Sequence, residues 1–567
     1  MNLKLHVATL LLPLPLWIQV PARLPATPQA EPDPKEACSI EGRVVDASTG
    51  EALRNASVTL RPASGASQAG RTSYATSTDK EGGFAVRGIA PGAYKLVAAR
   101  AGYPEMEYGS RARGRPGTQL TLVPRQNMTG LEFRLLRGGV ITGKVVDEYG
   151  DPVERASVQA MRFRFSGGER QLTTTNSAST DDQGNYRLFG LEPGRYFVRA
   201  ASSISGSVDT GQSGSRAEYI YPPVYYPGTT DESAATQVEV IGGAELTGVG
   251  FTMTKARAFR VTAQVQNLTG VTGRMIASLR SAAAARNPTL YLPRFVVLEP
   301  KQSAFTIQGI AAGRYLLAVG MSEQGRSYAG SEEIDIGDRD LSDIIIQLLP
   351  GSEIQGEVRL DGSSQMDLSV IRVTVSGPSA SALLIAGNAP VAFGTRSEGR
   401  VSEDGTFKLT DIYPDAANLS ITGLPDGFYV KSAHLGSQEV LESGLNLAKG
   451  LGERLTIVVS GRAGTVTGSV TDADNKPVGG ATVVLVPKSE KRREKNQFYK
   501  SAVSDQYGRF TIKNVDPGDY KAYAWEDIET GAWLDPELLK PLESKAEAVT
   551  VEPSGQYQLN LKPLPGS

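Results

Sequence analysis

The chain has 567 residues, which predicts several domains, because domains average about 150 residues. With 59 Lys+Arg against 61 Asp+Glu it carries a formal net charge of −2, which argues against binding nucleic acid through overall charge. Two histidines, His6 and His434, and one cysteine, Cys38, exclude sites built from several imidazoles or thiolates, and they exclude an internal disulfide.

The first 30 residues follow the plan of a secretory signal peptide. Lys4 precedes an apolar run over 7–20, and small residues follow it. The run is shorter than the roughly 20 residues that span a membrane. We therefore expect a signal peptide at 1–30, a linker at 31–37, and an exported protein in the periplasm, on the outer cell surface or secreted. A short uncleaved anchor and a lipid on Cys38 are alternatives, and no transmembrane span is predicted after the leader.

One motif recurs along the rest of the chain at intervals of roughly 100 residues, a domain length. In its first copy an apolar-x-Gly-x-Val strand, Ile40–Val44, is followed by an Asp-x-x-Gly turn at Asp79 and by Pro-Gly-x-Tyr at Pro91–Tyr94. The copies predict five domains, which we call modules 1 to 5: 38–136, 137–256, 257–350, 351–460 and 461–567. Modules 3 and 4 are degenerate copies.

The repeated turns predict β-structure. An Asp carboxylate accepts turn amides and Gly takes a positive φ, so Asp-x-x-Gly closes a hairpin, while Pro-Gly favours a type II turn. The segments after these turns alternate as half-buried strands do, and the best helical candidate, 278–286, is short. The sequence therefore predicts an all-β chain, a tandem array of about five antiparallel β-sandwich domains.

These motifs resemble the carboxypeptidase regulatory-like domain. The resemblance is carried by Ile40–Tyr94, with Asp79–Phe84 and Gly88–Gly92 inside it, and modules 2 and 5 match nearly as well. Cna B-type adhesin modules and carbohydrate-binding-like folds are similar too. The resemblance implies transthyretin-like or Ig-like sandwiches in a tandem-repeat protein of secreted bacterial type. In carboxypeptidases such a domain is an accessory, which implies no catalytic residue and no cofactor.

The residues themselves also argue against an enzyme. After removal of the leader His434 is the only histidine, which is too few for a His₂Glu zinc site. It has no Gly-x-Ser-x-Gly elbow beside it. We predict no catalytic, cofactor or metal residues. Calcium at the turn aspartates is an alternative to their turn role, and an unrecognised hydrolase is a weaker alternative. The turn aspartates are Asp79, Asp181, Asp404 and Asp505.

Binding is the expected role. Aromatic rings stack on sugar faces when exposed, and pack in cores otherwise. The candidate ligand-binding residues are Tyr221, Tyr225, Tyr226, Trp525 and Trp533. The main hypothesis is a non-catalytic spacer or binding scaffold of the cell envelope, and the alternative is a carbohydrate-binding protein. A polysaccharide or an envelope protein is the expected partner. The basic runs 111–115 and 488–495 are predicted to be solvated loops.

Overall fold

The computed structural model describes residues 36–63, 72–110, 115–166, 169–202, 219–267, 270, 273–282, 294–323, 326–362, 364–377, 381–383, 391–393, 395–414, 416–447 and 452–565. The predicted signal peptide lies outside these residues. Among the helices described, none is both long and apolar enough to cross a membrane.

The same strand arrangement occurs five times. In each module the first strand pairs antiparallel with the strand after the repeated turn and parallel with the last strand. The first strands are β1 (Cys38–Asp46), β9 (Gly139–Asp147), β20 (Phe259–Asn267), β27 (Ser352–Asp361) and β38 (Gly464–Val470). Their antiparallel partners are β4 (Gly83–Ile89), β12 (Asn185–Leu191), β23 (Ala304–Ile310), β32 (Thr406–Ile412) and β41 (Arg509–Val515). Their parallel partners are β8 (Asn127–Leu135), β18 (Phe251–Met253), β26 (Leu341–Pro350), β37 (Leu455–Ser460) and β44 (Gln556–Leu561).

This arrangement confirms the all-β, multi-domain prediction and corrects one detail of it. The sheets are not wholly antiparallel, because the last strand of each module returns beside the first strand in the same direction. A parallel neighbour needs a long crossover connection, and the strands of the second sheet supply it. The module limits given above remain proposed boundaries.

Four modules have a separate second sheet. In module 1 it comprises β2 (Ser57–Pro62), β3 (Tyr74–Ser77), β5 (Gly92–Arg100), β6 (Tyr103–Glu107) and β7 (Leu120–Leu122). In module 2 it comprises β10 (Ser157–Ser166), β11 (Glu169–Ser179), β13 (Gly194–Ala201), β15 (Val224–Tyr225) and β16 (Val238–Val240). In module 4 it comprises β28 (Arg372–Ser376), β31 (Arg396–Arg400), β33 (Ala416–Thr422) and β36 (Leu445–Asn446). In module 5 it comprises β39 (Thr482–Pro487), β40 (Lys500–Val503), β42 (Gly518–Trp525) and β43 (Glu547–Val551).

Module 3 differs, because its strands form one seven-stranded sheet in the order β22-β21-β24-β25-β26-β20-β23. Its remaining strands are β21 (Met275–Ser281), β22 (Arg294–Leu298), β24 (Gly313–Glu323) and β25 (Arg326–Ile336). Residues 278–281 of the helical candidate are therefore a strand, and 283–286 lie outside the described residues. This candidate is thus not a helix where it is described, because a buried strand flanked by two others holds the segment extended.

The remaining elements are short. The short strands are β14 (Tyr219–Ile220), β17 (Glu245–Leu246), β19 (Ala256–Arg257), β29 (Ser381–Leu383), β30 (Val391–Phe393), β34 (Tyr429–Leu435) and β35 (Gln438–Glu439). The described helices are η3 (Glu232–Ala234), η4 (Leu368–Val370), α2 (Glu490–Arg493), η5 (Asn496–Phe498), η6 (Ala532–Leu534), α3 (Pro536–Leu539) and η7 (Lys540–Lys545). Most of the helices belong to module 5, where they cover one face of the second sheet.

The repeated turn is built as the sequence predicts. Asp79 Oδ1 accepts hydrogen bonds from the backbone N–H groups of Glu81 (3.0 Å) and Gly83 (2.7 Å). Asp181 and Asp505 do the same in modules 2 and 5. Module 4 departs from the pattern, because the residue in the place of Asp79 is Ser402, two positions before Asp404.

A buried hydroxyl next to the turns of modules 1, 2 and 5 joins two loops. Thr180 Oγ1 accepts from the N–H of Ala156 (2.8 Å) and donates to the carbonyl of Val153 (2.6 Å). Thr78 and Ser504 make the equivalent pair of bonds in modules 1 and 5. We call this pair of hydrogen bonds the brace. It gives partners to two backbone groups that are buried from water, so it fixes the start of the second strand of the module against the turn.

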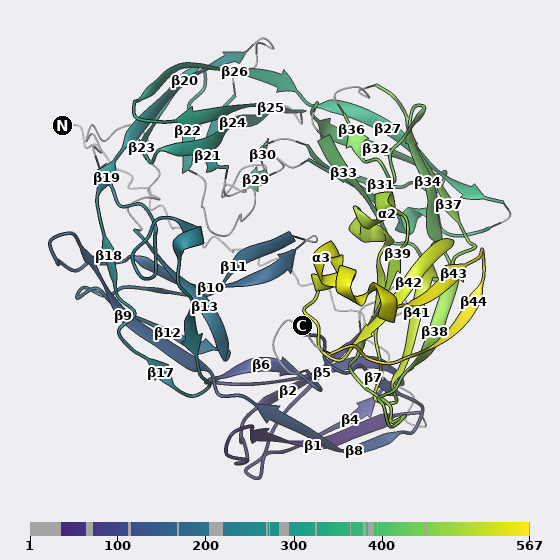
Figure 1. The fold of residues 1–567 in the computed structure, drawn as a ribbon. Coiled ribbons are helices and arrows are strands. Elements are labelled where there is room, and N and C mark those ends of the chain that lie inside the picture. The colour runs from purple at the N-terminus through teal and green to yellow at the C-terminus, as the bar shows by residue number, and fades with distance from the viewer. Residues whose placement is uncertain are drawn as a thin grey trace, which may run out of the picture.

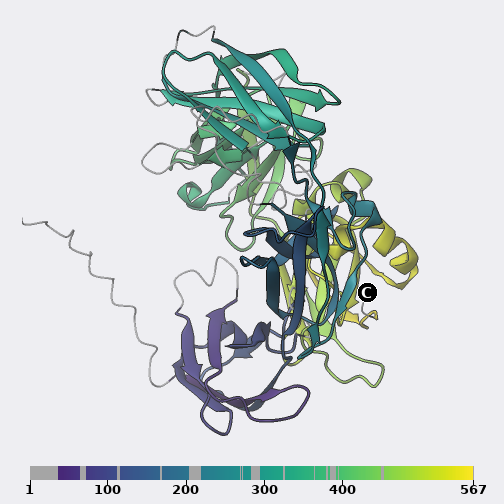
Figure 2. The ribbon, with the colours of Figure 1, turned by 90° about the vertical axis from the view of Figure 1, so that its left-hand side faces the viewer.

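The modules follow one another around a ring (Figure 1). Module 1, in purple, lies beside module 5, in green to yellow, although they are at opposite ends of the described chain. In the perpendicular view modules 3 and 4 lie at one end and module 1 at the other, with modules 2 and 5 between them (Figure 2). A parallel β-bridge between Gln119 and Asp505 marks the contact that closes the ring. We call the contact between modules 1 and 5 the seam.

Candidate functional site

The seam is made by the repeated turn of module 5. Gln506, the second residue of that turn, hydrogen-bonds the backbone N–H and carbonyl of Thr121 at 3.0 and 2.9 Å. The hydroxyl of the next residue, Tyr507, accepts from Gln126 Nε2 at 3.1 Å. Farther along, Arg115 Nε lies 3.3 Å from Asp527 Oδ1, and both side chains are largely buried. Backbone pairing, side-chain bonds and an ion pair therefore hold the two modules together.

Module 2 also touches module 5. Phe165, near the end of β10, packs against the hydrophobic cluster beneath the helices of module 5. Arg164 Nη1 lies 3.7 Å from Glu529 Oε1, with about a quarter of each side chain exposed. The last module is thus fixed by two others besides its neighbour in sequence.

A cleft of about 450 Å³ lies along the seam. Module 1 contributes Lys95, Glu105, Glu107, Ser110, Arg115 and Pro116, and module 5 contributes Thr482, Ser501, Ala502, Val503, Thr530 and Trp533. Charges in the lining are matched, since Lys95 Nζ lies 3.2 Å from the Glu107 carboxylate, which also accepts from the N–H of Gly117. The hydroxyl groups, the paired Glu107 carboxylate and the Trp533 indole suit the binding of a neutral polar molecule. The paired charges of the lining leave no strong electric field in the cleft to favour an ion.

Of the two tryptophan candidates, only Trp533 borders the cleft. It is 9% exposed and lies in η6. Trp525 is 1% exposed and stacks on Tyr523 with ring centroids 5.3 Å apart. Trp525 therefore packs in the core and is not an exposed platform, because the outer face of β42 is covered by the helical segment of module 5.

The three tyrosine candidates of module 2 also differ in how far each side chain is buried. Tyr225 is 2% exposed and packs with Met161 and Leu172, so it cannot offer a ring face to a ligand. Tyr226 is partly buried, with its ring edge-on to Phe251 at 6.3 Å. Tyr221 is partly buried beside Lys255. The structure therefore does not gather the five candidates into one site.

The sequence reasoning missed Tyr149. This ring is 77% exposed at the tip of the turn after β9. An aromatic residue between Glu148 and Gly150 in a turn was the available signal, since a turn tip cannot bury it.

Asp79, Asp181 and Asp505 accept hydrogen bonds from turn amides, as described above, and Asp404 Oδ1 accepts from the N–H of Thr406 at 2.9 Å. In the part of the chain that the structure describes, no group of three or more His, Cys, Asp or Glu residues could hold a metal ion.

His434 lies on β34, opposite Glu439 of β35.

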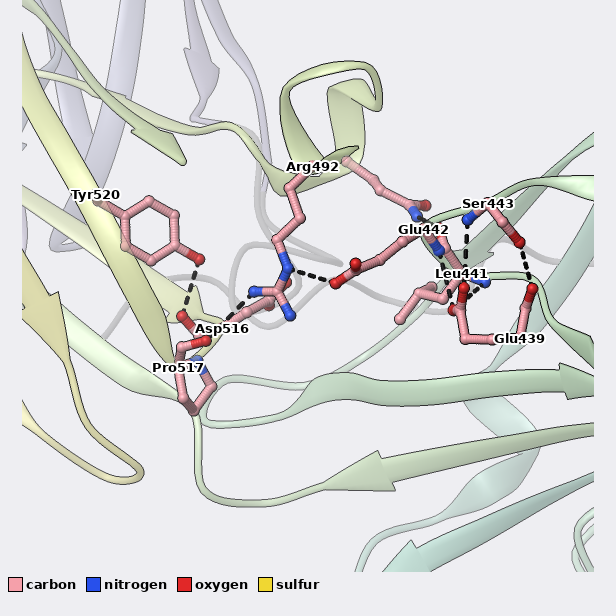
Figure 3. A network of polar contacts seen from close by, with 9 residues as sticks. Glu439, Leu441, Glu442, Ser443, Arg492, Asp516, Pro517 and Tyr520 are labelled. Carbon is pink, nitrogen blue, oxygen red and sulfur yellow. Dashed lines mark hydrogen bonds and ion pairs between the residues drawn. The ribbon is translucent and has the colours of Figure 1, made fainter. Parts of the chain in front are cut away.

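The junction of modules 4 and 5 contains the second basic run (Figure 3). Arg492, in α2, donates from Nε to Glu442 Oε1 at 2.7 Å and from Nη1 to the carbonyl of Pro517 at 3.3 Å. Phe498 lies in the core cluster of module 4. The prediction that 488–495 is a solvated loop is thus wrong for Arg492, because this charge lies in α2 and has a carboxylate partner across the junction. The same prediction for 111–115 is wrong for Arg115, which is ion-paired with Asp527 in the seam, and 111–114 lie outside the described residues.

Asp516 lies at the same junction. Burial raises the pKa of its carboxyl, and the ammonium of Lys500, 3.3 Å away, opposes that shift. Its backbone carbonyl accepts from the Tyr520 hydroxyl at 2.8 Å (Figure 3). Equivalent tyrosine-to-carbonyl bonds occur at Tyr94, Tyr196 and Tyr315, so this bond is part of the repeated fold.

Comparison with known proteins assigns the repeats. The family model of the carboxypeptidase regulatory-like domain matches residues 39–136, 140–213 and 465–527. No curated protein matches the chain.

Among solved structures, the minor pilin GBS52 of Streptococcus agalactiae is 13% identical, over 38% of this chain and 96% of that one, with a TM-score of 0.23. A streptococcal ancillary pilin is 12% identical, over 54% and 99%, with a TM-score of 0.20. Catechol 1,2-dioxygenase of Acinetobacter sp. ADP1 is 15% identical, over 18% and 54%, with a TM-score of 0.13. Likenesses this weak carry no argument about function.

The family matches coincide with the sharp copies of the motif, in modules 1, 2 and 5, and the strand plan extends to modules 3 and 4. The chain is therefore a tandem-repeat protein in which segments of the first, second and fifth modules match the family model of the carboxypeptidase regulatory-like domain.

Proposed function

We propose that this chain is an exported, non-catalytic structural or adhesive protein of the cell envelope, and that it works as a closed ring. The observation that carries the proposal is the seam, where Gln506 pairs with Thr121 and Arg115 with Asp527. A spacer has to be extended in order to span a distance, whereas a closed ring offers a rigid surface with fixed geometry. A single histidine after the predicted leader is too few for a catalytic His₂Glu zinc site, which supports a non-catalytic role.

Small-angle X-ray scattering of the mature chain tests the ring. We expect a compact distance distribution for the natural chain and a longer maximum dimension for the double variant Gln506→Ala, Arg115→Ala. A natural chain with the maximum dimension of an open array of five modules would contradict the closed ring. Cell fractionation tests export, because a protein recovered only from the cytoplasm would contradict an envelope role.

Carbohydrate binding in the seam cleft is the second candidate function. It is favoured by Trp533, since an indole beside hydroxyls and a paired carboxylate suits a sugar ring with one apolar face. A glycan array with the mature chain tests this candidate. We expect binding that Trp533→Ala abolishes while the scattering profile stays unchanged. Turnover of peptide or glycan substrates by the same preparation would instead support an unrecognised hydrolase.

A further inference from the structure

A short ribbon connects modules 2 and 3. It is formed by β14 and β19, and in its register Tyr219 faces Arg257 and Ile220 faces Ala256. Continuing this register places Tyr221 opposite Lys255, and the 5.6 Å from the Lys255 ammonium to the Tyr221 ring centroid agrees with that placement. Alternate residues of a strand share one face. Tyr219, Tyr221, Lys255 and Arg257 therefore belong to one face of the ribbon.

Tyr149 extends this face. The Lys255 ammonium lies 5.3 Å from the centroid of the Tyr149 ring as well, so it is held between the rings of Tyr149 and Tyr221. Glu148 Oε1 lies 3.4 Å from the same ammonium. Two cation–π contacts and one ion pair thus fix the rings relative to each other, although they come from segments about 70 residues apart. We call Tyr149, Tyr219 and Tyr221 the tyrosine platform.

The platform leaves aromatic surface in contact with water. Tyr149 is 77% exposed and Tyr219 is 60% exposed, whereas Tyr221 packs against the core of module 2. Large aromatic surfaces in water cost free energy that burial would recover, so grouped exposed rings mark a binding surface.

The charges around the platform do not favour a polyanion. Lys255 is paired with Glu148, and the Arg257 guanidinium donates to the backbone carbonyl of Asp338 at 3.3 Å. Asp147 accepts from the N–H groups of Tyr149 and Asp151, at 2.9 Å each. The three carboxylates of this turn, Asp147, Glu148 and Asp151, lie beside two cations, so no net positive charge attracts a polyanion and stacking is the main force available.

We propose that the tyrosine platform binds a neutral polysaccharide, with pyranose rings stacked on Tyr149 and Tyr219. Sugar rings present C–H faces that match aromatic faces, and their hydroxyl groups stay solvated or bond to the charged side chains beside the rings. The platform does not involve the seam or its cleft. Its binding is therefore separable from ring closure and from Trp533.

Affinity electrophoresis of the mature chain in native gels tests the proposal, with dextran, glucomannan and arabinogalactan as neutral polysaccharides and polygalacturonate as an acidic one. We expect retardation by at least one neutral polysaccharide, with affinity about five- to tenfold weaker in Tyr149→Ala and in Tyr219→Ala. The same affinity is expected at 0.5 M NaCl, because stacking is not screened by salt. Thermal unfolding of both variants should match that of the natural chain, since these rings are exposed.

Phe189→Ala is the matched control, because Phe189 is an aromatic residue of module 2 that is 63% exposed and lies outside the platform. It should bind like the natural chain. No retardation by any neutral polysaccharide, an equal loss in the Phe189 variant, or binding confined to polygalacturonate and abolished by salt would overturn the proposal. Binding lost in Trp533→Ala but kept in Tyr149→Ala would also overturn it, and would place the ligand in the seam cleft.

Discussion

The side chain of Gln506 occupies both hydrogen-bonding groups of the Thr121 backbone, 385 residues earlier in the chain. An amide side chain that bonds an N–H and a carbonyl together imitates a neighbouring β-strand, so it fixes the position of module 5 on module 1. Each of the two bonds contributes about 1 kcal/mol net.

Gln506→Ala should loosen the seam. The expected loss is about 1–2 kcal/mol of closure free energy, seen as faster hydrogen exchange at 118–122 and 505–507. Gln558→Ala, an exposed glutamine of the same module, is the control. Unchanged exchange in the Gln506 variant would show that the seam does not depend on these bonds.

Arg492→Lys should weaken the junction of modules 4 and 5. A lysine keeps the charge but cannot reach Glu442 and the Pro517 carbonyl together, so we expect a loss of about 1–2 kcal/mol. The readout is exchange of the amides at 496–499, next to buried Phe498. Lys491→Ala, on the exposed side of the same helix, should have no effect. If the two variants behave alike, Arg492 does not hold the junction.

Thr180→Val should destabilise module 2. Valine has the shape of threonine but leaves the Ala156 N–H and the Val153 carbonyl without their partner, which costs about 1–3 kcal/mol. Hydrogen exchange of β10 and β12 measures the local effect without assuming that the whole chain unfolds in one step. Thr252→Val, an exposed threonine of β18, is the control. Equal exchange in both variants would contradict a role for the brace.

Asp361 should make module 4 sensitive to acid. Hydrogen bonds from Arg462 (2.9 Å), Lys431 and Ser460 lower the pKa of its carboxyl to about 2. Because the folded pKa is below the unfolded value of about 3.9, its stabilisation is complete above about pH 4 and is lost as the pH falls toward 2.

The melting temperatures of the natural chain and of Asp361→Asn should therefore differ at pH 6 and converge near pH 2. Asp474→Asn, at an exposed carboxylate, controls for the change in net charge. A difference that stays constant down to pH 2 would contradict this assignment.

Calcium should not stabilise the protein through its turns. Asp79 and Asp181 each use one oxygen for two turn amides, so their geometry is complete without an ion. We expect the same melting temperature with 5 mM calcium and with a chelator. A rise on adding calcium would show a site that the described residues do not reveal.

The local structure could be predicted from the sequence, and the ring could not. Asp79 and Gly83 lie close together in the sequence, so a short motif predicts their turn. Gln506 occupies a variable position of the same motif, where module 1 has Lys80 and module 2 has Asp182. Its partner, Thr121, lies in another module, and no local sequence pattern predicts such a contact.

Whether Trp525 is exposed could not be decided from the sequence, for a different reason. Alternation along β42 places Tyr520 on the core face and Tyr523 and Trp525 on the other face. Alternation predicts that the second face is exposed, but the helical segment after β42 covers it. Tyr149, by contrast, is exposed although it is aromatic, because a turn tip stays exposed whatever its residue. Exposure was thus decided by chain segments remote from the strand pattern.

The seam also makes the number of repeats matter. An open array can gain or lose a unit by duplication or deletion and change only in length. Here Gln506 of the fifth module meets Thr121 of the first, so this contact depends on the path of the chain through the modules between them. Modules 3 and 4 match the motif least, yet they form part of that path. A change in the number of modules would therefore alter the path that brings Gln506 to Thr121.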